Sequence, residues 1–203
     1  MLKQSATQNK RPLFFVAHSL GGLICANALS QSHSPDEARE NLVEHARGIV
    51  FLGTPFFDSE ESAVRFGQKV LSITETEKLR KIHRSFATFV ESRYRRNHFL
   101  EIACYFETRN TGDDGVLVDE ALSTIYGYTP LPIDEDHEGM CKFASESHSG
   151  FISITDKLNS WIKPMEERSE SYELVAAGPF ALPGRRVAID FNGTVPFRIT
   201  FKD

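Results

Sequence analysis

The chain has 203 residues, of which 40% are hydrophobic and 25% are charged, which suffices for one globular domain and a tail. Its 23 basic and 28 acidic residues give a net charge of −5, so composition excludes a general attraction to nucleic acid or anionic membranes. Three widely spaced cysteines form no CxxC or Cys/His cluster: Cys25, Cys104 and Cys141. We therefore expect reduced, buried thiols in an intracellular protein, and no metal or other cofactor.

The N-terminal third contains an uncharged run that needs an explanation. Residues 1–11 are polar and do not resemble a signal peptide. Residues 12–29 contain no Asp, Glu, Lys or Arg, but His18, Ser19 and a pair of glycines interrupt the run near its middle. The run is therefore better explained by a buried strand followed by a buried helix than by a membrane span.

The predicted elements alternate along the chain. In order, we expect a strand at 13–17, a helix at about 20–31, a helix beginning at 34–37, a strand at 48–52, helices at 59–72 and 75–96, a strand at 101–106, short apolar runs at 116–118 and 131–133, and a helix at 149–162. Buried strands that alternate with helices predict an α/β fold, a mostly parallel sheet covered on both faces, over residues 1–163.

The C-terminal segment differs in character from what precedes it. Residues 164–185 include the polar stretch EERSES and are expected to form a linker. In residues 186–203 two alternating apolar stretches flank Asn192-Gly193-Thr194, which predicts a β-hairpin or the start of a further module.

The segment AHSLG at residues 17–21 is the strongest chemical signal. It lies between the predicted buried strand and a helix that opens with Gly21-Gly22. This is the pattern of a nucleophile elbow, in which small residues on either side let a serine stand on a tight turn. Ser19 is therefore the candidate nucleophile, and the backbone N–H of Leu20 is a candidate donor to an oxyanion at the helix N-terminus.

A serine nucleophile requires a base and an orienting acid, in the chain order Ser, acid, His. His137 follows a short apolar run and is the preferred base, with His148 as the alternative. Two carboxylates remain open as the acid. Glu107 ends the third predicted strand, whereas Asp114 lies in a Gly-Asp-Asp-Gly segment before an apolar run.

Four segments together resemble the serine-active-site-containing (SERAC-type) α/β-hydrolases. They are FVAHSLGGL at 15–23, GIVFLGTP at 48–55, FET at 106–108, and DH at 136–137 followed by MCKF at 140–143. The resemblance covers roughly residues 10–163. It favours Glu107 as the acid and His137 as the base, although Ala17 replaces the usual glycine of the elbow.

The resemblance also implies that part of the fold is missing. It makes the strand at 13–17 the fifth of eight, so strands one to four and a His-Gly loop that supplies a second oxyanion donor are expected to be absent. With its third-strand neighbour missing, the strand at 13–17 would be an exposed apolar edge. Self-association through that edge and impaired turnover are therefore expected.

The resemblance implies a serine hydrolase of the carboxylic-ester or lipase class. The expected substrate is a lipid or small ester, and the expected location is peripheral on a mitochondrial or endoplasmic-reticulum membrane, or otherwise cytoplasmic. Two alternatives stay open. Similar fungal domains precede STAND-type ATPase modules, so the chain could be a non-catalytic input or effector module, and it could also be a non-functional fragment.

Overall fold

The computed structural model describes residues 11–31, 37–70, 76–166 and 173–177, and its strands form one parallel sheet. The strands are β1 (Leu13–His18), β2 (Ala46–Leu52), β3 (Glu101–Glu107), β4 (Leu131–Ile133) and β5 (Glu173–Ala177). Their order across the sheet is β4-β3-β2-β1-β5, and every neighbouring pair is parallel. The α/β class and the parallel sheet predicted from the sequence are confirmed.

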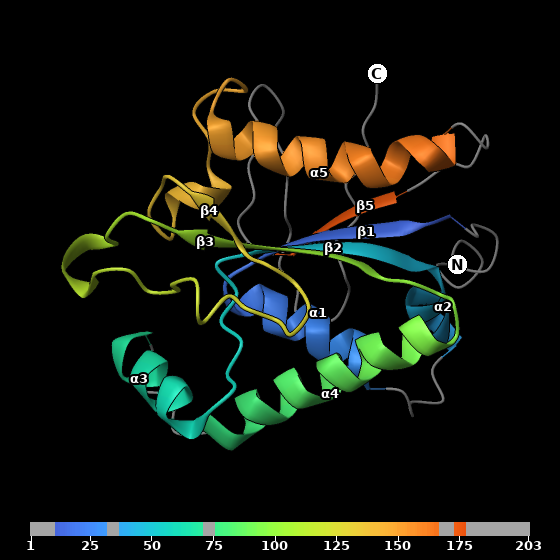
Figure 1. Ribbon diagram of the computed structural model, residues 1–203, viewed down its shortest axis with the longest axis horizontal. Helices are drawn as coiled ribbons and strands as arrows, with labels where there is room; N and C mark the ends of the chain where they lie inside the picture. The colour runs from blue at the N-terminus through green and yellow to red at the C-terminus, as the bar shows by residue number, and fades with distance from the viewer. Residues whose placement is uncertain (1–10, 32–36, 71–75, 167–172, 178–203) are drawn as a thin grey trace, which may run out of the picture.

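Helices cover both faces of the sheet (Figure 1). They are α1 (Leu20–Ser30), α2 (Glu37–His45), α3 (Glu60–Val70), α4 (Thr76–Arg95) and α5 (Ser149–Glu166), with short 3-10 helices η1 (Gly112–Asp114) and η2 (Gly139–Cys141). Helix α5 lies alone on one face, and α1 and α4 lie on the other, with α3 beyond the end of the sheet. The connections between parallel strands therefore carry helices to both sides, as parallel strands require.

Two apolar cores are separated by the sheet, because successive strand residues point to opposite faces. In β1, Phe15 and Ala17 join the core beneath α1 and α4, whereas Phe14 and Val16 join the core beneath α5. The same alternation holds in β2 and β3. This two-sided burial explains why the central strands are uniformly apolar rather than alternating.

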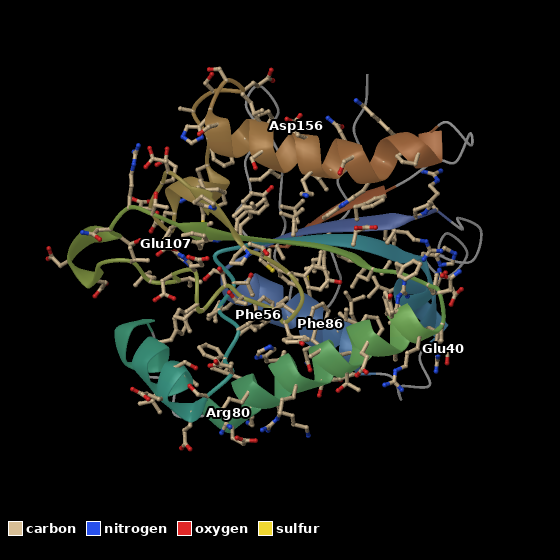
Figure 2. The ribbon with its side chains drawn as sticks, viewed as in Figure 1. Glu40, Phe56, Arg80, Phe86, Glu107 and Asp156 are labelled. Carbon is tan, nitrogen blue, oxygen red and sulfur yellow. The ribbon has the colours of Figure 1, made fainter. Side chains whose placement is uncertain are left out.

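Aromatic side chains fill the larger core. Phe56 and Phe86 stack with ring centroids 6.4 Å apart, and Phe51 meets both rings edge-on. Figure 2 shows Phe56 and Phe86 between the sheet and α4. Each of these rings is at most 1% exposed, so each contributes roughly 1.5–3 kcal/mol through burial. This packing holds α4 against β2 and the segment that follows it.

The strand β1 is not an edge of the sheet, contrary to the expectation for residues 13–17. It pairs with β2 on one side and with β5 on the other, from Leu13 opposite Glu173 to Ala17 opposite Ala177. The physical basis for self-association through a bare β1 edge is therefore removed. Sequence reasoning failed here because the partner strand comes from a segment with no strong strand pattern, and each paired residue lies 160 positions further along the chain (173 − 13 = 160).

The C-terminal boundaries also differ from expectation. Helix α5 continues through Pro164 to Glu166 instead of ending near residue 162, although a proline in this position removes a backbone hydrogen bond and crowds the carbonyl four residues earlier. Strand β5 lies inside the segment 164–185 that was expected to be a linker. The hairpin expected at 186–203 lies outside the described residues. In the described part of the chain, no helix combines the length and the apolar character needed to cross a bilayer.

Candidate functional site

Three of the sequence-predicted residues meet where the parallel strands end. Ser19 follows β1, Glu107 is the last residue of β3, and His137 lies in the loop after β4. Figure 2 shows Glu107 at the end of the sheet. Parallel strands present all their carboxyl ends at one edge, so residues 118 positions apart in the chain become neighbours there.

Ser19 stands on a strained turn between β1 and α1. Its backbone has φ 53° and ψ −134°, a conformation that non-glycine residues rarely adopt. Its amide nitrogen donates to Leu52 O at 2.8 Å, which extends the pairing of β1 with β2 by one residue. Helix α1 begins at the next residue, so the amide of Leu20 belongs to the positive end of that helix.

A chain of two side-chain hydrogen bonds joins Ser19, His137 and Glu107. The Oγ of Ser19 lies 2.9 Å from Nε2 of His137, and Nδ1 of His137 lies 2.6 Å from Oε2 of Glu107. A carboxylate only accepts hydrogen bonds, so Nδ1 carries the proton and Nε2 is left to accept from the serine hydroxyl. The serine is thereby connected to a base, and the base to an acid.

The carboxylate of Glu107 is held by the main chain of a following loop. Its Oε1 accepts hydrogen bonds from the amides of Leu117 at 2.5 Å and Val118 at 3.1 Å. The residue is 1% exposed, and buried charge requires such compensation. The apolar run at 116–118, which had been associated with Asp114, therefore binds the other acid.

The alternative acid and base lie elsewhere. Asp114 is exposed in η1, where its amide donates to Thr111 O at 3.2 Å. His148 uses Nε2 to contact Glu135 Oε1 at 2.9 Å, while its Nδ1 accepts from Gly150 N at 3.1 Å. Both ring nitrogens of His148 are engaged, so the structure brings Glu107 and His137 to Ser19, and not Asp114 or His148.

Two glycines, Gly53 and Gly22, allow neighbouring segments of the site to pack closely together. Gly53, which follows β2, has φ +53°, and a Cβ there would lie 2.9 Å from Cε1 of His137 and 2.8 Å from Sδ of Met140. In α1, a Cβ on Gly22 would lie 2.0 Å from Oγ1 of Thr54. Helix α1, which follows the serine, and the loop that carries the histidine thus both pack directly against the segment after β2.

Replacing Gly22 with alanine is expected to destabilise the protein by about 1–3 kcal/mol, because the new methyl group would overlap the buried Thr54 side chain. This outweighs the gain of about 1 kcal/mol that alanine normally brings to a helix. The measurement is the free energy of unfolding in urea.

Thr54→Ala in the same background provides the control. It removes the two nearest atoms, Oγ1 and Cγ2, and Oγ1 has no hydrogen-bond partner to lose. Part of the lost stability should return. A Gly22→Ala protein as stable as the wild type would show that α1 does not pack this closely.

Two residues at the site were not singled out by sequence reasoning. His18 is 7% exposed, and its Nε2 lies 2.7 Å from the carbonyl oxygen of His137. Thr111 accepts the amide N–H of His137 at its Oγ1, at 3.0 Å. His18 lies inside the elbow segment itself, but nothing in the sequence of that segment predicts a contact with a residue 119 positions away.

Burial, and after it the neighbouring His137, lowers the pKa of His18 to about 4. His18 is therefore neutral near pH 7. The cysteines are also perturbed: burial raises the pKa of Cys25 and Cys104 to about 12 and that of Cys141 to about 11. Such thiols are poor nucleophiles and poor metal ligands.

Among the residues that the structure describes, no group of three or more His, Cys, Asp or Glu side chains is arranged to hold a metal ion. No family model, curated protein or solved structure matches this chain.

Proposed function

We propose that this chain is a serine hydrolase of the carboxylic-ester or lipase class, with Ser19 as nucleophile, His137 as base and Glu107 as orienting acid. The observation that carries the proposal is the continuous hydrogen-bonded chain from Ser19 Oγ through both nitrogens of His137 to Glu107 Oε2. A serine hydroxyl is a weak nucleophile unless an adjacent base removes its proton.

The reaction follows from the positions of these groups. Ser19 Oγ attacks the acyl carbonyl of an ester as its proton passes to Nε2 of His137. The negative charge of Glu107 stabilises the imidazolium that forms, and the amide of Leu20 donates to the developing oxyanion. His137 then protonates the departing alkoxide, and water releases the acyl group from Ser19 by the reverse sequence.

The chain order of the site residues supports assignment to an α/β-hydrolase fold. The serine follows β1, the acid ends β3 and the histidine follows β4, which is the order expected for that fold. In this assignment β5 lies beside β1, in the position that the SERAC-type resemblance gives to a third strand. A lipid-like substrate and a peripheral membrane location rest on that resemblance.

The direct test is labelling with a fluorophosphonate probe, which modifies only activated serines. Ser19 is expected to be the labelled residue, because its hydroxyl contacts the base, and Ser19→Ala should abolish labelling. Ser160→Ala is the matched control, since Ser160 is exposed on α5 and donates only to Lys157 O. Labelling that persists in Ser19→Ala would remove Ser19 from the mechanism.

A further inference from the structure

The main chain of His137 is held from both sides by side chains of two other segments. Its carbonyl oxygen lies 2.7 Å from Nε2 of His18, and its amide nitrogen lies 3.0 Å from Oγ1 of Thr111. A carbonyl oxygen only accepts, so His18 is the donor and its proton is on Nε2. A backbone amide only donates, so the Thr111 hydroxyl is the acceptor.

Two consecutive residues, His18 and Ser19, both contact His137. His18 binds the main chain of His137, and the next residue, Ser19, binds its imidazole at Nε2. The two imidazole rings lie with centroids 4.8 Å apart and tilted by 43°. Two consecutive residues of the elbow therefore contact both the main chain and the side chain of His137.

Thr111 connects the same residue to the acid. It precedes the loop residues Leu117 and Val118, whose amides hold Glu107. A single loop after β3 thus holds the carboxylate by its main chain and the amide of His137 by one hydroxyl.

We propose that His18 and Thr111 are positioning residues that fix the main chain of His137, so that its imidazole meets Ser19 and Glu107 at the same time. The inference rests on the proposed hydrolase function but makes a structural claim of its own. His18 must act as a neutral donor, and its low pKa, near 4, keeps it neutral when His137 gains a proton. A second positive charge beside the imidazolium is thereby avoided.

The test compares variants that keep or remove each hydrogen-bonding group. The amide nitrogen of H18Q can reach the position of Nε2, whereas that of H18N is one carbon short and stands near Nδ1. T111S keeps the hydroxyl, whereas T111V removes it at nearly constant volume. Displacement of a catalytic group by about 1 Å can cost roughly 10²-fold in rate.

We expect H18N and T111V each to lower kcat on a short-chain aryl ester by about 10–100-fold, with KM changed by less than about threefold. H18Q and T111S should recover most of the lost kcat. A merely structural role would instead lower the fraction of folded protein, so active sites are titrated with the fluorophosphonate and thermal unfolding is measured for every variant.

A spectroscopic readout separates this inference from the proposed function. The proton of His137 Nδ1 in its 2.6 Å bond to Glu107 should give a far-downfield proton resonance. That resonance should be present in the wild type, H18Q and T111S, and broadened or lost in H18N and T111V. If the wild-type protein has no esterase activity but the resonances follow this pattern, the proposed hydrolase function is wrong and the positioning role of His18 and Thr111 still holds.

The inference is overturned if H18N and T111V both retain wild-type kcat and the wild-type resonance. It is equally overturned if kcat falls as much in H18Q as in H18N, because a hydrogen-bond donor at the position of Nε2 would then not restore the activity.

Discussion

Replacing His137 with alanine should lower kcat/KM for an aryl ester by about 10⁴–10⁶-fold, the range expected when the base of a serine nucleophile is removed. Ser19 Oγ lies 2.9 Å from Nε2 of this residue. Without that nitrogen, no base accepts the hydroxyl proton as the serine attacks. The leaving alkoxide also loses its proton donor, so both halves of the reaction suffer.

The fold should survive this change better than the activity does. His137 lies in a loop, and its backbone contacts with His18 and Thr111 do not depend on its side chain. Circular dichroism and a urea titration of His137→Ala would establish that folded protein is being assayed.

His148→Ala is the matched control, because it removes a histidine from the same region that has no contact with Ser19. His148 instead contacts Glu135 and accepts from Gly150, so at least about a third of the activity should remain. If His148→Ala proves as damaging as His137→Ala, the assignment of the base must be abandoned.

Replacing Glu107 with glutamine should lower kcat by about 10³–10⁴-fold while leaving KM nearly unchanged. Glutamine keeps the shape of the side chain and can still accept from the amides of Leu117 and Val118. It lacks the negative charge that stabilises an imidazolium, and its NH₂ group can meet His137 Nδ1 only as a donor. That would favour the tautomer in which Nε2 carries the proton and cannot accept from Ser19.

Asp114→Asn is the control for the loss of one negative charge near the same loop. Asp114 is exposed in η1, and its replacement should change kcat by less than about threefold. The pH dependence of kcat/KM should be measured for both variants. A larger loss in Asp114→Asn than in Glu107→Gln would transfer the role of the acid to Asp114.

Much of the architecture could be predicted from the sequence because it depends on local pattern. Apolar runs bounded by turns located β1, β2 and β3 to within about two residues, since a strand covered on both faces must be apolar throughout. The pattern AHSLG located the turn at Ser19, because only small neighbours allow a serine to adopt positive φ between a strand and a helix. The chain order of the motifs narrowed the base to two histidines and the acid to two carboxylates.

Only the tertiary structure shows which residues from remote segments of the chain contact one another at the site. Sequence spacing could not separate Glu107 from Asp114, because Glu107 ends β3 and Asp114 follows it by only seven positions. Only the folded loop shows which carboxylate faces His137. The contacts of His18 and Thr111 with His137 arise because the end of β1 and the loops after β3 and β4 converge at one end of the sheet.

The pairing of β5 with β1 could not be predicted from the sequence either. Backbone hydrogen bonds between parallel strands are made by groups that every residue except proline carries, so they leave little trace in side-chain pattern. The local sequence therefore determined the turn that presents the serine, and the fold alone determined which side chains surround it and which strand completes the sheet beside it.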